Sequence, residues 1–474
     1  MTKGCILDNL SFYERRIWKD TSYSEDNRTR SATALRMKEA VEELVADFER
    51  RRLPEVTPRH LRMPRLPGKI DVIVGMRRSG KTSYLFQELR SHEASGVGRD
   101  RLLYLDFEDE RLAGLTAAEL RHIPDVFYRR HPASREQTCW FYFDEIQNVP
   151  GWERFLRRLI DTEQVVVTIS GSSAKLLSRE IATSLRGRSL TSELFPFSFA
   201  EALAHAGLAV PVRWPPPSGE RSQLEHRLDR YLEVGGFPEV QDLPVDLRRR
   251  VLRDYVDVVL FRDVAERHGV ANLEALRHLQ RSLLARPANC FSIHRLHNDL
   301  RSQGVRVGKD SLHQYLAYLE DAFLVFTVEI AAPSIRARQV NPRKCYLIDP
   351  GLTAVTSLRA SADRGHRLEN LVYLELRRRG CSLAYLHTAA GHEVDFLAEL
   401  PDGSRELVQV TESLADARTR ERELRALREA MDELEVADAR VVTRGETETI
   451  DLDGRRVAVV PAWRWLLEPP APPR

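Results

Sequence analysis

A glycine-rich segment of the sequence has residue types and spacing that suit phosphate binding. Residues 75–82 read Gly-Met-Arg-Arg-Ser-Gly-Lys-Thr and fit the pattern Gly-x-x-x-x-Gly-Lys-Ser/Thr. Glycines let backbone amides curl around phosphate oxygens, and the start of a helix adds partial positive charge. The residues that we expect to hold the phosphates of a nucleotide are Gly75, Met76, Arg77, Arg78, Ser79, Gly80, Lys81, Thr82 and Ser83.

A second motif supplies the carboxylates that nucleotide hydrolysis needs. Residues 139–145 read Cys-Trp-Phe-Tyr-Phe-Asp-Glu, which is an apolar strand pattern that ends in two acids. Lys81 can reach the β- and γ-phosphates, while Thr82 and Asp144 can hold Mg²⁺. Glu145 can polarise the attacking water as a general base. The two motifs together predict an ATPase that uses ATP and Mg²⁺.

Polar residues that follow the next apolar run are candidates for a supporting role. The run at residues 165–170 ends in Ser170-Gly-Ser-Ser. Ser170, or as a second choice Ser172, could sense the γ-phosphate, and a capped helix entry is the alternative. Arg186 and Arg188 follow, and one of them could act as an arginine finger toward a neighbouring subunit. That role implies a homo-oligomer, whereas the alternative is two solvated surface arginines.

The elements that must position these motifs form an α/β pattern. Short apolar runs at residues 70–74, 101–107, 139–143 and 165–170 alternate with charged helices. Nearly continuous apolar strands between helices indicate a parallel sheet that is covered on both faces. Helical spacing of apolar residues between 34 and 48 predicts an earlier helix, and helical patterns continue through about residue 270.

The region from residue 272 to 335 reads as three helices and a β-hairpin, which is the order of a winged helix. The third helix is expected to begin near Lys309 and to bury Leu312, Tyr315, Leu316 and Leu319. Basic and polar residues near it could read DNA, although acidic residues in the same helix oppose this. We therefore leave DNA contact and a structural or protein-binding role as equal alternatives. The candidate contact residues are Arg295, His297, Arg301, Arg306, Lys309, His313 and Gln314.

A second α/β unit is expected from about residue 343 onward. Its predicted strands lie at 344–348, 383–387, 393–400, 406–411 and 439–443, the last being its final strand. Its predicted helices lie at 365–379 and 417–433.

Several further segments give the chain a family resemblance. They are Val149-Pro-Gly-Trp152, Leu185-Arg-Gly-Arg188, Leu194-Phe-Pro-Phe-Ser-Phe199, Tyr231-Leu-Glu-Val-Gly-Gly-Phe-Pro238, Leu347-Ile-Asp-Pro-Gly351 and Leu368-Glu-Asn370. With the two motifs above, they resemble prokaryotic AAA-like P-loop ATPases whose C-terminal half is a domain of unknown function. The resemblance covers residue 69 to the end and leaves the physiological client open.

The resemblance implies a fold class and a set of domains. It implies an α/β protein with a three-layer P-loop ATPase core at residues 69–205 and a helical lid at 206–270. A winged helix at 271–335 and a degenerate nuclease-like α/β domain at 336–474 would follow. The helical segment at 1–68 lies outside the resemblance. The implied function is Mg²⁺-dependent ATP hydrolysis coupled to a DNA or protein client, and the alternative is a nucleotide-gated DNA-binding regulator that hydrolyses ATP slowly.

The C-terminal unit resembles the PD-(D/E)XK nuclease fold through Glu369 on a helix, Asp395 on a strand and Gln409-x-Thr411 on the next strand. Cleavage needs carboxylates that hold Mg²⁺ and a lysine beside the attacking water. Threonine cannot supply that cation, and glutamine is a weak neutral ligand. We therefore expect the fold without cleavage, and a metal-dependent nuclease is the less favoured alternative.

Nearby residues offer no replacement for the missing lysine. Glu412 would point to the opposite face of its strand from its neighbour Thr411. Lys309 and Lys344 are too distant in sequence to be assigned as substitutes.

Composition limits the remaining choices. The chain has 474 residues, which predicts about three domains at roughly 150 residues each. Its 72 basic and 70 acidic residues neither require nor forbid a nucleic-acid partner. No apolar run approaches the roughly 20 residues of a membrane helix. The 5 scattered cysteines and the charged start of the chain favour a reducing cytoplasm.

Overall fold

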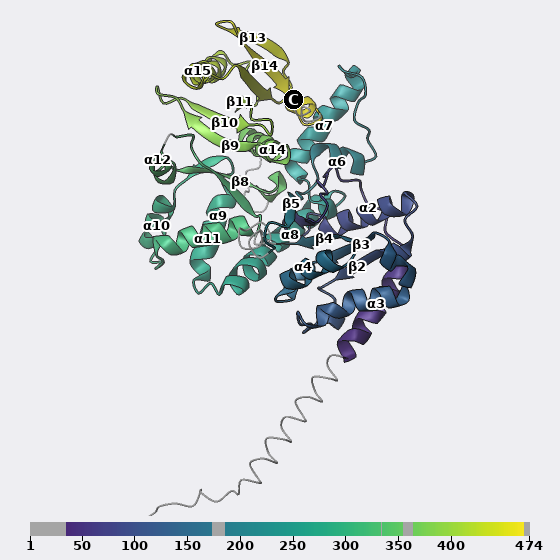
Figure 1. Ribbon diagram of the computed structural model, residues 1–474. Coiled ribbons are helices and arrows are strands. Elements are labelled where there is room, and N and C mark those ends of the chain that lie inside the picture. Colours follow the sequence, from purple (N-terminus) through teal and green to yellow (C-terminus); the bar gives the residue numbers. More distant parts are fainter. Residues whose placement is uncertain (1–34, 173–184, 333, 354–363, 469–474) are drawn as a thin grey trace, which may run out of the picture.

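The computed structural model describes residues 35–172, 185–332, 334–353 and 364–468 (Figure 1). The expected N-terminal segment 1–68 is therefore described only from residue 35. Ser173, the last residue of the Ser170-Gly-Ser-Ser segment, lies outside the described residues.

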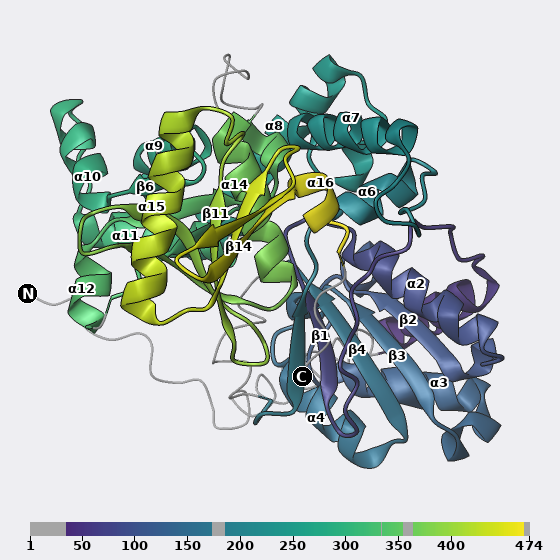
Figure 2. The ribbon, with the colours of Figure 1, turned by 90° about the horizontal axis from the view of Figure 1, so that it is seen from above.

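A parallel sheet forms the centre of the first domain (Figure 2). Its strands are β1 (Ile70–Val74), β2 (Leu102–Asp106), β3 (Cys139–Asp144), β4 (Val165–Gly171) and β5 (Ser189–Glu193), in the order β2-β3-β4-β1-β5. Helix α2 (Lys81–Ala94) packs on one face, while α3 (His122–Arg130) and α4 (Trp152–Thr162) pack on the other. The predicted parallel α/β core is confirmed.

The helix expected before the core is present over residues 35–50. Its apolar stripe is buried: Met37, Ala40, Val41, Leu44, Val45 and Phe48. Its outer face is joined to α3, because Arg129 pairs with Glu42 at 2.9 Å and Arg130 with Glu49 at 2.6 Å. The helix therefore packs as part of the first domain.

Helical elements follow the sheet. They are α6 (Phe199–His205), α7 (Ser218–Val234), α8 (Val245–Val258) and a π-helical segment, Val259–Glu266. The helical patterns expected through about residue 270 are thus confirmed. In Figure 1, α6 and α7 lie above the parallel sheet and beside the C-terminal half of the chain, here defined as residues 271–468.

The next elements are α9 (Leu273–Leu284), β6 (Asn289–Phe291), α10 (Ile293–Ser302), α11 (Lys309–Asp321), β7 (Val325–Val328), α12 (Ile335–Val340) and β8 (Arg343–Leu347). The four apolar residues predicted for the third helix are buried on α11. Strand β8 pairs antiparallel with both β6 and β7. The expected boundary at residue 335 therefore divides one sheet, since β8 follows the boundary and β7 precedes it.

The last domain also has a sheet between helices. Its elements are α14 (Arg364–Arg378), β9 (Ser382–His387), β10 (Glu393–Glu399), β11 (Arg405–Val410), α15 (Ala417–Leu434), β12 (Asp438–Thr443), β13 (Glu448–Leu452), β14 (Arg455–Pro461) and α16 (Ala462–Trp465). The strand order is β13-β14-β12-β11-β10-β9. The expectation that the strand at 439–443 is the last was wrong. A hairpin follows it and turns at Asp453-Gly454, where both residues have positive φ as a tight hairpin turn requires.

The buried Asp349 joins the helical region to the C-terminal half. Its Oδ2 accepts a hydrogen bond from the Gly236 amide at 2.5 Å, and its Oδ1 accepts one from the Gly351 amide at 2.8 Å. Gly235 has a φ of 79°, and a Cβ at this position would overlap the Asp349 carboxylate. This contact explains why two of the segments that carry the family resemblance contain these glycines and this aspartate.

We expect the Asp349→Ala variant to lower the free energy of unfolding by roughly 2–4 kcal/mol, because two buried amides lose their acceptor. Urea unfolding of the full chain measures the change. The control is Asp242→Ala, whose carboxylate is 88% exposed and should leave stability nearly unchanged. Equal stability of Asp349→Ala and the wild type would contradict the role assigned to this contact.

Among the described residues, no helix is both long and apolar enough to cross a membrane.

Candidate nucleotide-binding site

The glycine-rich segment forms the tight connection between β1 and α2. Gly80 has a φ of 99°, which is a backbone conformation that favours glycine. A Cβ on Gly75 would collide with the carbonyl oxygen of Leu194, which follows β5. Both glycines are therefore required by the fold of the loop, and the strand–loop–helix context predicted for the motif is present.

The N-terminus of α2 is open to an anion. No side chain in the described part of the chain caps this helix, and its first turn holds no acidic residue. The first amides of a helix lack partners within the helix and carry partial positive charge. The loop and the helix start therefore fit the phosphates of a nucleotide.

Lys81 and Glu145 face each other in this site. The Lys81 Nζ donates to the carbonyl oxygens of Gly75 at 3.1 Å and Met76 at 3.3 Å, and it lies 3.6 Å from Glu145 Oε1. Burial alone would raise the pKa of Glu145, but the Lys81 charge and hydrogen bonds from Gln147 and Ser172 bring it below its usual value. Glu145 is thus an ionised carboxylate at neutral pH, as a general base must be.

Asp144 collects hydroxyl donors from three elements. The Thr82 Oγ1 donates to Asp144 Oδ2 at 2.6 Å, and the Tyr104 hydroxyl donates to the same oxygen at 3.0 Å. The Ser170 hydroxyl donates to Oδ1. Burial raises the pKa of Asp144, and the bonds from Ser170 and Thr82 oppose that rise. Thr82 and Asp144, the pair expected to hold Mg²⁺, are therefore in direct contact and their oxygen donors fit that ion.

Ser170 contacts both residues of the acidic pair. Besides its bond to Asp144, its Oγ accepts a hydrogen bond from the Glu145 amide at 3.3 Å. The Ser172 amide donates to Glu145 Oε2 at 3.2 Å. Both serines therefore orient the acidic pair, and direct contact of Ser170 with the γ-phosphate stays a prediction.

The side chains of the two arginines of the loop pair with acidic residues of other elements. Arg77 Nε donates to Asp263 Oδ1 at 3.0 Å, and its Nη1 donates to Glu108 Oε1 at 3.1 Å. Arg78 lies 3.5 Å from Glu239. Both side chains thus join the loop to neighbouring elements, and phosphate contact by these two residues stays a prediction.

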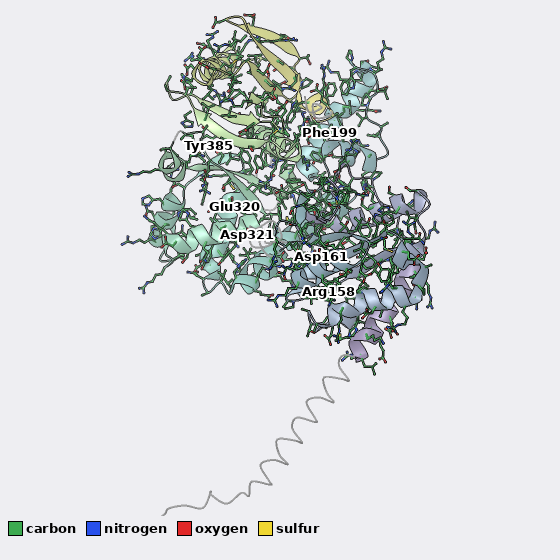
Figure 3. All side chains as sticks on the ribbon, in the orientation of Figure 1. Arg158, Asp161, Phe199, Glu320, Asp321 and Tyr385 are labelled. Atoms are coloured by element: carbon green, nitrogen blue, oxygen red, sulfur yellow. The ribbon has the colours of Figure 1, made fainter. Side chains whose placement is uncertain are left out.

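Arg186 and Arg188 lie far from the loop of their own subunit. Strand β5 runs parallel to β1, with Ser189 beside Ile70 and Glu193 beside Val74. Arg188 precedes β5 and is therefore about 17 Å along the sheet from the end where the loop begins. Its side chain pairs with Asp161 of α4, which Figure 3 labels. An arginine finger at these positions could act only on a neighbouring subunit, and this role stays a prediction.

Arg59 and Tyr104 are two site residues that sequence reasoning missed. The buried Arg59 supports the loop from behind, because its Nη1 donates to the Ser79 carbonyl oxygen at 2.8 Å and its Nη2 to the Phe195 carbonyl oxygen at 2.5 Å. Tyr104 lies on β2, next to β3 and two residues before its end. A polar hydroxyl near the end of a strand beside β3 was the one signal in the sequence that could have placed Tyr104 at the site. The segment around Arg59 has no motif.

Comparison with known proteins identifies an AAA domain in the region that contains this candidate site. Residues 67–203 match the AAA domain family, residues 225–363 match a domain of unknown function (DUF8612), and residues 364–465 match another (DUF4143). The uncharacterized protein MJ1544 of Methanocaldococcus jannaschii is 35% identical over 438 residues, which cover 90% of this chain and 95% of that protein. The chain belongs to the same family of AAA-domain proteins.

Another relative and the solved structures have lower sequence identity to this chain. An uncharacterized protein of Haemophilus influenzae is 30% identical over 334 residues, which cover 70% of this chain and 80% of that protein. Among solved structures, the Walker-type ATPase PABY2304 of Pyrococcus abyssi is 14% identical, with a TM-score of 0.36, and the match covers 68% of this chain and 94% of that one. The AAA-like P-loop ATPase domain expected from the sequence is confirmed by the match at residues 67–203.

Proposed function

We propose that this AAA-family protein hydrolyses ATP in a Mg²⁺-dependent reaction and couples the cycle to a DNA or protein client through its C-terminal half. The observation that carries the proposal is the hydrogen bond between Thr82 and Asp144, beside the Lys81–Glu145 pair and at an open helix N-terminus. A phosphate cradle, an ion-binding pair and an ionised base are thereby gathered at one edge of the sheet.

Each residue has a distinct task in this proposal. The loop amides and Lys81 bind the phosphates, and Thr82 and Asp144 hold the magnesium ion. That ion, when bound, neutralises charge that develops on the β- and γ-phosphate oxygens. Glu145 takes a proton from the attacking water. Because Lys81 now faces Glu145, its move to the phosphates would free that carboxylate for its task.

Contacts between the ATPase core and the C-terminal half support the coupling. Arg78 pairs with Glu239, three residues beyond the Gly236 amide that binds Asp349. On β5, Glu193 accepts two hydrogen bonds from Arg377 of α14, each at 2.7 Å. These contacts connect the phosphate loop and the sheet of the first domain to the C-terminal half, so a change in the loop could alter the position of that half.

A nucleotide-gated DNA-binding regulator with slow hydrolysis is the second candidate. The order α9, β6, α10, α11, β7 and β8 supports a winged helix. Between α9 and α10 lies a cavity of about 580 Å³, lined in part by Arg281, Arg286 and Arg295. Basic side chains of this kind suit phosphates of a nucleic-acid backbone.

Turnover with and without duplex DNA separates the two candidates. Phosphate release from ATP should be measured for the full chain alone, with duplex DNA and with single-stranded DNA. Stimulation that is lost in the Arg286→Ala, Arg295→Ala double variant would favour a DNA client. Slow turnover that DNA leaves unchanged, together with DNA binding that depends on ATP, would favour the regulator.

We expect alanine variants of Arg186 and Arg188 to identify a finger that acts between subunits. The finger variant should bind ATP as the wild type does and hydrolyse it more slowly. Mixing it with Lys81→Ala should restore activity, because each subunit can then supply what the other lacks. Arg158→Ala, an exposed position on α4 that Figure 3 labels, is the control. Specific activity that is independent of protein concentration, with no complementation, would rule out the finger.

A further inference from the structure

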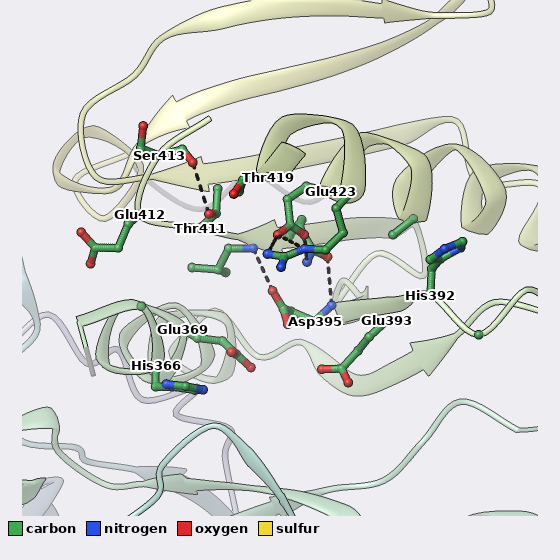
Figure 4. A pocket seen from close by; sticks show the side chains of 16 residues that line it. His366, Glu369, His392, Glu393, Asp395, Thr411, Glu412, Ser413, Thr419 and Glu423 are labelled. Atoms are coloured by element: carbon green, nitrogen blue, oxygen red, sulfur yellow. Dashed lines mark hydrogen bonds and ion pairs between the residues drawn. The ribbon is translucent and has the colours of Figure 1, made fainter. Parts of the chain in front are cut away.

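A cavity of about 640 Å³ opens between α14, β10, β11 and α15 in the C-terminal domain. Figure 4 shows the labelled side chains of Glu369, Glu393 and Asp395 at this cavity, the first from α14 and the other two from β10. Glu369 and Asp395 occupy the helix and strand positions at which the nuclease resemblance expects carboxylates, and Glu393 is an additional one. Gln409 also lines the cavity, and its amide donates to Glu423 Oε2 at 2.6 Å.

Lys344 of β8 reaches the centre of these carboxylates. Its Nζ lies 3.0 Å from Glu369 Oε1, 2.6 Å from Glu393 Oε1 and 2.8 Å from Asp395 Oδ1, and its side chain is 2% exposed. The sequence argument that set Lys344 aside as too distant was therefore wrong about its place. The chain after β7 pairs with β9 through Ile330 and Tyr385, and this brings β8 beside the C-terminal sheet.

The three carboxylates form a site for a cation, and the Lys344 ammonium occupies it. Three carboxylate oxygens around one point form the donor set that hard divalent cations use. An ammonium has three N–H donors and no acceptor, so Lys344 can give one hydrogen bond to each carboxylate. Burial alone would lower the pKa of Lys344, but Asp395, Glu369 and Glu393 raise it well above its ordinary value. The ammonium is thus charged in this position.

Two further donors contact the carboxylates of this cluster. The Tyr346 hydroxyl donates to Glu369 Oε1 at 2.8 Å, and the Val410 amide donates to Asp395 Oδ2 at 2.9 Å. Over the described ranges, no group of three or more His, Cys, Asp or Glu side chains is arranged to hold a metal ion. The divalent metal of the nuclease fold therefore does not fit here while Lys344 is in place.

We propose that the Lys344 ammonium is a built-in cation that takes the place of a divalent metal among Glu369, Glu393 and Asp395. The pocket then binds no divalent metal in the wild-type chain, and removing the lysine opens such a site. The same contacts fasten β8, and with it the β6-β8-β7 sheet, to the C-terminal domain.

Manganese binding to the nucleotide-free full chain tests this proposal. Mn²⁺ is the probe, followed by electron paramagnetic resonance and by the thermal unfolding midpoint. We expect Lys344→Met to bind one more equivalent of Mn²⁺ than the wild type and to gain thermal stability when Mn²⁺ is added. Adding Asp395→Asn to this variant should remove the extra equivalent. Lys309→Met, an exposed lysine on α11, should behave as the wild type does.

Two results would overturn the proposal. One is that the wild-type chain uses this pocket for a metal. It would then bind Mn²⁺, or cleave linear, circular or single-stranded DNA or RNA in Mg²⁺ or Mn²⁺, and Asp395→Asn would abolish the binding or the cleavage. The other is a folded Lys344→Met variant with no additional Mn²⁺.

A further variant covers the case in which Lys344→Met does not fold even with Mn²⁺. The triple variant Lys344→Met, Glu369→Gln, Asp395→Asn removes the ammonium together with two of the carboxylate charges that face it. It should fold without metal if Lys344 acts as a cation. If the triple variant also fails to fold, the lysine is needed for something other than its charge and the proposal is wrong.

Discussion

Lys81→Ala is expected to abolish ATP hydrolysis and to weaken nucleotide binding. Lys81 is the cation at the start of α2, and its side chain is 6% exposed in a site with two buried carboxylates. Without it, the γ-phosphate would meet Glu145 and Asp144 with less positive charge to offset their repulsion. Steady-state phosphate release and equilibrium nucleotide binding by the purified variant measure the two effects.

An exposed lysine of the C-terminal half provides the control. Lys309 lies at the start of α11, far along the chain from the phosphate loop. Lys309→Ala should therefore leave turnover without DNA nearly unchanged. Wild-type turnover in Lys81→Ala would mean that the loop is not the nucleotide site.

Glu145→Gln is expected to keep ATP binding and to slow hydrolysis by about 10²–10⁴-fold, which is the usual contribution of a general base. Glutamine nearly preserves the shape of the side chain but cannot accept the proton of the attacking water. Because Lys81 holds the pKa of Glu145 below its usual value, the wild-type carboxylate is ionised at neutral pH, as the proposed base must be. Single-turnover hydrolysis under saturating ATP separates this step from binding.

The control for this variant is Glu136→Gln, an exposed glutamate shortly before β3. It lies toward the end of β3 opposite to Asp144 and should not alter the rate. If Asp144→Asn and Glu145→Gln both leave turnover untouched, the acidic motif has been assigned to the wrong strand.

Local signals in the sequence were sufficient for the central part of the site. The phosphate loop needs glycines at fixed positions between a strand and a helix, and the Asp144–Glu145 pair ends an apolar strand. Parallel strands then bring these ends to one edge of the sheet, so contact between Thr82 and Asp144 follows from motifs alone. The strand β5 escaped prediction because its sequence, Ser-Leu-Thr-Ser-Glu, is polar and only half-buried at the edge of the sheet.

Residues whose role depends on packing between distant segments could not be predicted. Three of these contacts join residues that are far apart in the sequence. The separation is 20 residues between Arg59 and Ser79, 40 between Tyr104 and Asp144, and 51 between Lys344 and Asp395. None of these spacings has a regular period that sequence reasoning could detect. The β13–β14 hairpin is different, because Asp453-Gly454 is a local turn signal that was available and overlooked.

Phosphate release from ATP by the purified full chain is the most direct test of the central claim. It should be followed over a range of protein concentrations, in Mg²⁺ and in EDTA, with and without duplex DNA. The proposal expects saturable turnover that requires Mg²⁺ and is absent from Lys81→Ala. No turnover by the wild-type chain at any concentration, with or without DNA, would contradict it.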